Sequence, residues 1–364
     1  MTDPRTPEYY ERLKEFRQFD KVVFSTGDKL SARSRSAERA PLTTGLSPYT
    51  GPWGEYEAAH LLKRTLFGCE REQVDIFTAM TLQQAVDLLL TPEDTPSPPI
   101  NNYAAFVNSN DRDEDVNEGE TWVYAKHIDN LSFARQMSLK GWWLRLMINQ
   151  TTSIHQKLML FWHALLPTQI FDSGLPNVSH QYVQLLHKYS LGNYKYLVWQ
   201  MTINPAMLLY LNGAANVKEA PDENYARELQ ELFTVGKGPN SKFTESDVYQ
   251  AARVLTGWTV AWESIISGPN PRYYFNFYNH DTGDKQFSSF YGNRTITGRE
   301  GNQGKDETYE LIEMIFDNEE TALYICRRLY NFFVYHQIDA QTEANVIVPL
   351  AAIFRENNFE ILPV

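Results

Sequence analysis

The stretch IHQKLMLFWHALL, residues 154–166, decides the fold class of this chain. Its large apolar residues recur three or four positions apart, which is the spacing of one face of an α-helix. The stripe consists of Ile154, Leu158, Phe161, Trp162 and Leu165. The stripe predicts a helix packed into a protein core and argues against a helix lying on a membrane surface.

The chain on both sides of this stretch carries the same helical pattern. Residues 133–147 precede it and residues 179–199 follow it, so we expect nearly continuous helix from Trp122 to about Met207. Apolar periodicity and capping residues predict further helices outside this region. These cover residues 55–67, 82–90, 222–234, 244–256, 306–316 and 319–335, with a last helix beginning near Ala344.

The periodicity changes after Trp258. Aromatic residues alternate along residues 273–278, and a turn-like NHDTGD sequence then leads to Phe287. This alternation predicts a small β-hairpin near residues 270–290. The predicted fold class is therefore mainly α, a multi-helix globular body with one small β-hairpin insertion.

The predicted domain organisation is one helical domain with an N-terminal arm. Residues 1–52 are polar and rich in Ser, Arg, Gly and Pro, which predicts an irregular arm. Residues 53–364 are predicted to form a single helical domain. Within it we expect a surface loop at residues 92–120 and a hairpin excursion at residues 263–305.

The loop at residues 92–120 contains an acidic run. Asp111, Asp113 and Asp115 have the spacing of the first ligands in a calcium-binding loop. Val116 and Trp122, however, stand where such a loop requires Gly and Glu. We therefore interpret the segment as a solvated acidic loop.

Composition excludes several classes of function. The 364 residues include 33 Lys and Arg against 45 Asp and Glu, a net charge of -12, so the chain lacks the basic charge that nucleic-acid binding requires. No stretch approaches the roughly 18 apolar residues of a membrane span, so a soluble protein is expected. The N-terminus has no apolar secretion core, so the localisation is cytoplasmic by default and otherwise unknown. Cys69 and Cys326 are too few for a disulfide framework, and both are predicted to be buried thiols. Dinucleotide, P-loop, serine-hydrolase and zinc motifs are absent from the sequence.

The helix predicted at residues 222–234 is the first candidate site. Its spacing turns four apolar residues toward the core: Tyr225, Leu229, Leu232 and Phe233. Asn224, Arg227, Glu228 and Glu231 then share the other side. Two carboxylates one turn apart could hold a divalent cation or position a water for general-base chemistry. The alternative is a solvated face on which Arg227 pairs with Glu223 or Glu231.

Two further positions are candidates because histidine titrates near neutral pH. His280 and Asp281 lie in a turn between aromatic runs, where they could transfer a proton or bind a metal. Alternatively, Asp281 bonds to the backbone two residues further on. His163 lies on a strongly apolar helix, where a hydrogen-bonded core histidine is the first expectation and a ligand the second.

The chain resembles the bacterial domain of unknown function 1800 family from about residue 55 to its end. The resemblance rests on motif blocks that occur in the order of that family, and the fourth block and the LTGW of the fifth are the most specific. The blocks are HLLKRTLFG (60–68), FWH (161–163), NPAMLLYLNG (204–213), ENYARELQELFTVG (223–236), TESDVYQAARVLTGW (244–258), HDTGDKQF (280–287) and RRLYNFFV (327–334).

The resemblance implies no established activity. It implies a bacterial protein, often exported, whose gene frequently neighbours that of an alkaline phosphatase and sulfatase-like protein. One departure concerns a histidine pair, since relatives commonly read FWHNHF where this chain reads FWHALL. Residues carried over by motif are His60, Arg64, His163, Asn224, Arg227, Glu228, Glu231, His280, Asp281 and Lys285.

Two functional hypotheses of different classes follow. The first is an enzyme-like polar pocket for metal-assisted hydrolysis or group transfer, formed by the residues of helix 222–234 with His280 and Asp281. A divalent metal would be held by Glu228, Glu231 and His163. The second is a non-catalytic scaffold that docks a partner such as the phosphatase or sulfatase-like neighbour through an exposed aromatic patch. That patch would consist of residues 273–278 with Phe287 and Phe290.

Overall fold

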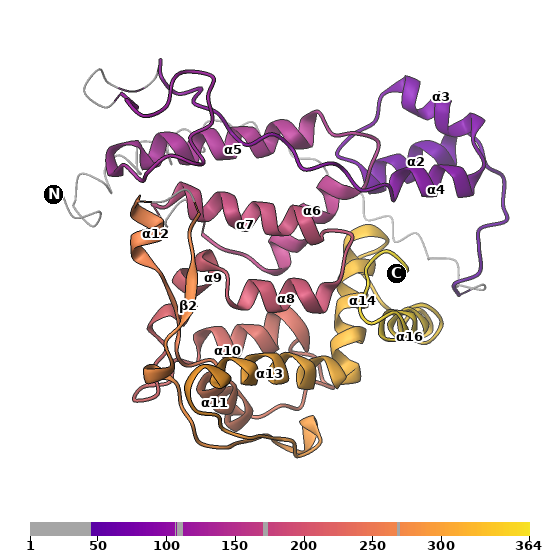
Figure 1. Ribbon diagram of the computed structural model, residues 1–364. Helices are drawn as coiled ribbons and strands as arrows, with labels where there is room; N and C mark the ends of the chain where they lie inside the picture. The colour runs from indigo at the N-terminus through magenta and orange to yellow at the C-terminus, as the bar shows by residue number, and fades with distance from the viewer. Residues whose placement is uncertain (1–44, 106, 108–111, 170–173, 268–269) are drawn as a thin grey trace, which may run out of the picture. The chain divides into compact units, whose positions relative to one another are not determined.

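The computed structural model describes residues 45–105, 107, 112–169, 174–267 and 270–364. Most of the predicted arm, residues 1–44, and Asp111 of the acidic run lie outside these described residues. Helices dominate the described chain, with a few short antiparallel strands (Figure 1). The prediction of a mainly α fold with a small β element is confirmed.

The helices follow one another with short connections in most of the chain. The α-helices of eight residues or more are α2 (Glu55–Thr65), α3 (Arg71–Ala79), α4 (Leu82–Leu89), α5 (Ser132–Ile148), α6 (His155–Leu165), α7 (Pro176–Tyr189), α8 (Tyr194–Thr202), α11 (Glu245–Val254), α13 (Lys305–Asp317), α14 (Glu319–Phe333) and α16 (Val348–Glu356). Shorter α-helices are α9 (Pro205–Tyr210), α10 (Asn224–Glu228), α12 (Trp262–Ser267) and α15 (Ala340–Thr342). No helix within these described ranges is long and apolar enough to cross a membrane.

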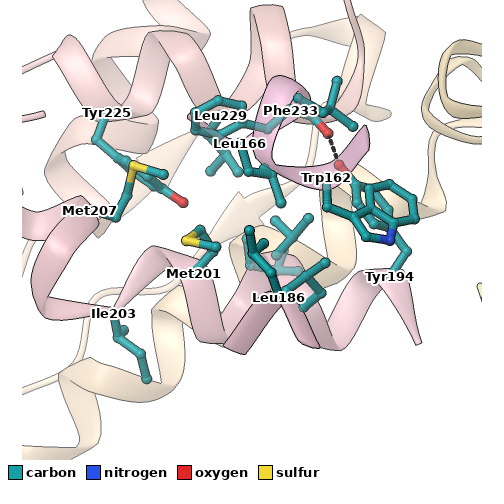
Figure 2. Packing of buried hydrophobic residues seen from close by; sticks show 14 of the residues in the cluster. Trp162, Leu166, Leu186, Tyr194, Met201, Ile203, Met207, Tyr225, Leu229 and Phe233 are labelled. Atoms are coloured by element: carbon teal, nitrogen blue, oxygen red, sulfur yellow. Dashed lines mark hydrogen bonds between the residues drawn. The ribbon is translucent and has the colours of Figure 1, made fainter. Parts of the chain in front are cut away.

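The main core is built around α6 and α8. The Trp162 ring stacks on Tyr194 with centroids 4.8 Å apart, and its indole Nε1 donates to the Ser190 carbonyl oxygen at 2.9 Å. The Tyr194 hydroxyl donates to the carbonyl oxygen of Phe233 (Figure 2). The apolar stripe that predicted α6 is therefore buried, except that Ile154 is half-buried. A second cluster of buried residues joins α2, α3 and α4 through Leu62, Phe77 and Leu89.

The strands pair differently from the predicted hairpin. Strand β2 (Tyr273–Phe275) pairs with the earlier strand β1 (Trp258–Val260), in the register Trp258 to Phe275. Strand β3 (Lys285–Gln286) pairs with β4 (Thr295–Ile296). The expected pairing of residues 273–277 with the region of Phe287 is not found in the described chain. Trp258 explains the difference, because its ring packs against Phe275 at 5.2 Å and sets the register of β1 on β2.

The segment at residues 222–234 is not one regular helix. The short α10 continues into a π-helix, η4 (Leu229–Thr234), in which the amide of Val235 donates to the Gln230 carbonyl oxygen at 2.9 Å. A π turn is wider than an α turn, so side chains after it leave the predicted 3.6-residue faces. Leu232 is therefore 42% exposed, while Gln230 is fully buried. The prediction that Leu232 faces the core is wrong.

The acidic loop at residues 92–120 is anchored to the protein core. Tyr103 and Val116 belong to the main hydrophobic cluster. The side chains of Asp113 and Arg135 on α5 are both 0% exposed and form an ion pair of 2.6 Å. For Asp113 the interpretation as a solvated acidic loop is wrong, because its charge is neutralised inside the protein.

The thiols also differ from each other in burial. Cys326 is buried as predicted, and burial raises the pKa of its thiol to about 12. Cys69 is half-buried, so for this residue the prediction of a buried thiol is wrong. Both cysteines are free thiols.

Candidate functional site

Arg227 organises an ionic cluster at the start of α11. Its guanidinium donates to Glu223 at 2.8 Å and to Glu245 at 2.6 and 3.0 Å, and it lies 3.5 Å from Glu231. The Lys237 ammonium forms a second ion pair with Glu231. Both pairings of the alternative interpretation, with Glu223 and with Glu231, are present. Most of the charge on this face is therefore neutralised by neighbours.

Glu228 is the exception in this cluster. Within the described part of the chain it forms no ion pair and no hydrogen bond through its carboxyl group, and its Oε2 is buried without a partner. The residue as a whole is half-buried, so the other edge of the carboxyl group faces the surface. Burial and the neighbouring charge of Glu231 raise the pKa of Glu228, while Lys237 and Arg227 act in the opposite direction. A raised carboxyl pKa at an accessible position is typical of residues that exchange protons.

Asn224 stands apart from this chemistry. It is the first residue of α10, and its side chain is exposed. Its backbone amide donates to Asp222 Oδ1 at 2.8 Å, a turn contact two residues apart just before the helix. Among the residues predicted on this helix, Arg227, Glu228 and Glu231 form the cluster and Asn224 marks its edge.

His280 belongs to a second, fully buried network. Its Nε2 lies 3.1 Å from Glu307 Oε1, and its Nδ1 lies 2.9 Å from the carbonyl oxygen of Thr256. The Lys285 ammonium donates to Glu307 Oε2 at 2.5 Å and also to the carbonyl oxygen of Asp281. The side chains of His280, Lys285 and Glu307 are at most 1% exposed. Burial at this depth is expected for a network that fixes the fold rather than one that meets a substrate.

Asp281 forms the turn contact that was the alternative interpretation from the sequence, and it also pairs with Arg253. Its carboxylate accepts two hydrogen bonds from Arg253, at 2.7 and 2.9 Å, and accepts the amide of Gly283 at 2.8 Å. The bond to Gly283 is the predicted turn contact two residues further on. Burial alone would raise the pKa of Asp281, but the bonds from Arg253 and Gly283 lower it. The carboxylate is therefore held in its ionised form.

Helix α11 separates the two networks. Glu245 at its first position belongs to the Arg227 cluster, and Arg253, eight residues later, binds Asp281. Eight residues span about 12 Å along a helix axis. The predicted convergence of Glu228 and Glu231 with His280 and Asp281 therefore finds no support in these contacts.

His163 lies in different surroundings again. Its contacts are the Tyr182 hydroxyl, 2.8 Å from Nδ1, and the Trp143 ring, 5.1 Å between centroids. No group of three or more His, Cys, Asp or Glu side chains that could hold a metal ion is found within the described ranges. The predicted metal site of Glu228, Glu231 and His163 is thus without structural support.

The two remaining motif residues lie on α2. His60 is exposed, and Arg64 donates from Nη2 to the carbonyl oxygen of Val334 at 2.9 Å. The Arg64 bond joins α2 to the end of α14. Within the described chain, neither His60 nor Arg64 has a contact with the clusters described above.

The motif blocks extend over most of the chain, and a comparison with family models shows which family they belong to. Residues 60–364 match the model described as "Protein of unknown function (DUF1800)". The chain belongs to the DUF1800 family. No curated protein and no solved structure matches it.

Sequence reasoning missed four charged residues of this DUF1800 chain: Glu245 and Lys237 in the Arg227 cluster, and Arg253 and Glu307, which contact Asp281 and His280. Glu307 has a signal in the sequence, because it precedes Leu311 by four residues and Met314 by seven, on the apolar face of α13. An acidic residue on such a face indicates a buried ion pair. Arg253 has no comparable signal, since its role depends on the turn that brings Asp281 to the end of α11.

Proposed function

We propose that α10 and η4 form an acid–base centre in which Glu228 exchanges a proton with a bound substrate during hydrolysis or group transfer. The observation that carries the proposal is the buried Oε2 of Glu228, which has no partner among the described residues. Leaving a buried polar atom unpaired costs about 1–3 kcal/mol, so such an atom in a native protein needs an explanation, and a catalytic role is one.

The charges around Glu228 suit a group that acts first as an acid. The raised pKa keeps the carboxyl group protonated at higher pH than an ordinary glutamate, so it can donate a proton to a leaving group. The carboxylate that results is stabilised by the nearby charges of Lys237 and Arg227. It regains its proton from the water that completes hydrolysis. A divalent metal, predicted from the sequence, is an addition that this scheme does not require.

The buried network supports the centre indirectly. A substrate cannot reach His280, Lys285 or Glu307 without displacing the protein around them, because these side chains are at most 1% exposed. We assign to them the role of fixing the segment 280–287 against α11 and α13. Helix α11 in turn presents Glu245 to Arg227, which lies next to Glu228 in the sequence.

Replacing Glu228 by Gln is expected to stabilise the protein above the ordinary carboxyl pKa of 4.5. The folded protein retains this proton to higher pH than the unfolded chain, so the wild-type free energy of unfolding falls as pH rises from 4.5 through the raised native pKa. Glu228→Gln lacks this loss. We expect its Tm at pH 8 to exceed that of the wild type by about 1–2 °C, a modest value because solvent screens the half-buried group.

The control for this prediction is Glu245→Gln, measured by the same thermal scans at pH 5 and pH 8. The pKa of Glu245 is lowered, first by its hydrogen bond from Arg227. Removing this charge is therefore expected to lower Tm slightly, which is the opposite sign. A Glu228→Gln protein that is less stable than the wild type at pH 8 would assign Glu228 a structural role and contradict the proposal.

Protonation of Glu228 is tested directly by carbodiimide labelling with an amine nucleophile at pH 6.5, followed by peptide mass spectrometry. Carbodiimides activate protonated carboxyl groups, so we expect Glu228 to be labelled ahead of the paired Glu231 and Glu245. Equal labelling of all three carboxyl groups would remove the chemical basis of the proposal.

Partner docking is the second candidate, and a specific surface favours it. Tyr273, Tyr274 and Tyr278 are 37%, 48% and 72% exposed, and Trp262 on the adjoining α12 is 53% exposed. The patch is smaller than predicted, since Phe287 is buried and Phe290 packs against Tyr291. Tyrosine and tryptophan are enriched at protein interfaces. The phosphatase or sulfatase-like neighbour implied by the family resemblance is the partner we propose for it.

Docking is tested by pull-down of that neighbour with the wild type and with Tyr274→Ala/Tyr278→Ala. Hot-spot aromatic residues cost about 2 kcal/mol or more when truncated, so at least a tenfold loss of binding is expected. A control variant, Tyr309→Ala, removes an exposed tyrosine on α13 and is expected to bind normally. Unchanged binding by the double variant would exclude this surface.

A further inference from the structure

A separate group of polar side chains lies where α5, α6 and α7 pack together (Figure 1). His163 of α6 is half-buried, and its Nδ1 lies 2.8 Å from the Tyr182 hydroxyl of α7. The same hydroxyl lies 2.8 Å from the carbonyl oxygen of Leu166. A carbonyl oxygen only accepts and the tyrosine has one proton, so both bonds form together only when Nδ1 of His163 donates.

This tautomer leaves Nε2 of His163 as an acceptor without a hydrogen of its own. Burial lowers the pKa of His163, so the ring is neutral at neutral pH. The described chain supplies no donor to Nε2. Because the residue is half-buried, a molecule from solvent can approach this nitrogen.

Two buried polar groups accompany this nitrogen. The Trp143 ring stands edge-on to the His163 ring at 5.1 Å and 74°, and its indole Nε1 is buried without a partner among the described residues. The Thr168 hydroxyl lies at the Tyr182 phenol; burial raises the pKa of that phenol, and the hydrogen bond of Thr168 lowers it. Trp143 and Thr168 are only 8% and 9% exposed. A buried N–H without a partner, such as that of Trp143, indicates an absent ligand or water, because proteins pair nearly all such groups.

We propose that His163, Trp143, Thr168 and Tyr182, together called the His163 site, bind a neutral hydroxyl-bearing molecule of the sugar or polyol class. A hydroxyl group is both donor and acceptor, so it can donate to Nε2 of His163 and accept from the Trp143 N–H. The site contains no ionised side chain, so nothing in it offsets the cost of desolvating a charged ligand. The proposal stands independently of the acid–base centre at Glu228.

Binding is tested by titrating glycerol and methyl glucoside into the full chain labelled with nitrogen-15 histidine. We expect a saturable shift of the Nε2 resonance of His163, while sodium acetate and methylammonium chloride cause none. Trp143→Phe, which keeps a ring but removes the N–H, is expected to weaken binding about five- to tenfold, the effect of one hydrogen bond. Trp142→Phe is the matched control, since its indole already donates to the Ser97 carbonyl oxygen at 2.7 Å.

Three results would overturn the His163 site. An Nε2 resonance that no polyol shifts would mean that water alone occupies the site. A saturable shift with acetate or methylammonium would contradict the assignment to a neutral ligand. Equal weakening by Trp143→Phe and Trp142→Phe would trace the effect to the packing of α5. If Trp143→Phe does not fold, Thr168→Val removes only a hydroxyl group and is expected to cause the same weakening.

Discussion

Glu307→Gln is expected to lower the free energy of unfolding by about 3–5 kcal/mol, measured by urea denaturation at pH 7. The substitution keeps the shape of the side chain but removes the only carboxylate that binds Lys285 within the described chain. The ammonium of Lys285 is 0% exposed and would keep only neutral acceptors, the amide oxygen introduced at position 307 and the carbonyl oxygen of Asp281. Uncompensated burial of this charge is the physical cause of the loss.

The second half of this prediction is a double-mutant cycle with Lys285→Met. The double variant removes both charges, so its loss is expected to be smaller than the sum of the two single losses by about 1–3 kcal/mol. Glu310→Gln on the same helix breaks a partly exposed pair with Arg299 and is expected to cost less than about 1 kcal/mol. Additive single losses would contradict a direct interaction between Glu307 and Lys285.

Arg135→Met is expected to destabilise the protein by a similar amount, about 3–5 kcal/mol. The guanidinium donates to Asp113 Oδ2 at 2.6 and 3.1 Å and to the carbonyl oxygen of Lys126 at 2.7 Å. Methionine fills part of the volume but leaves the Asp113 carboxylate buried without a cation. Hydrogen exchange should show that protection is lost in residues 112–127 as well as in α5.

Two variants separate charge from geometry at this position. Arg135→Lys keeps the charge but cannot reproduce the forked donor arrangement, so we expect a partial loss. Arg135→Met combined with Asp113→Asn removes both charges and should recover part of the stability. If Arg135→Met cost less than about 1 kcal/mol, the segment carrying Asp113 would not depend on this pair.

The helices were predictable because their signals are local. The stripe in residues 154–166 and the Thr244 capping box, in which Thr244 and Asp247 bond reciprocally, depend on residues within a few turns of each other. Helices α6 and α11 accordingly begin within a few residues of the predicted positions. The alternative interpretation, in which Arg227 pairs with Glu223 or Glu231, also depends on local spacing. Both of these partners lie four residues from Arg227, and both ion pairs are present.

The features that escaped prediction depend on contacts far apart in the chain. The π-helix turns Leu232 outward and buries Gln230, whose Oε1 accepts the Tyr291 hydroxyl at 2.8 Å. The pairing of β1 with β2 is likewise set by the packing of Trp258. From the sequence alone, a charged residue such as Asp113 is predicted to be solvated. Its buried partner Arg135 is 22 residues away and is identified only by the structure. The candidate site was therefore predicted as one cluster, whereas the structure divides its residues between two networks and the His163 site.

The central claim is that Glu228 transfers protons in a reaction, and turnover by matched variants tests it most directly. Wild type, Glu228→Gln and Glu310→Gln, which breaks a pair outside the Arg227 cluster, are compared on chromogenic carboxylic, phosphate and sulfate esters and glycosides between pH 5 and pH 9. We predict turnover of at least one class by the wild type, a loss of about 100-fold or more in Glu228→Gln, and a change below about threefold in Glu310→Gln. Turnover by Glu228→Gln within threefold of the wild type would contradict the claim.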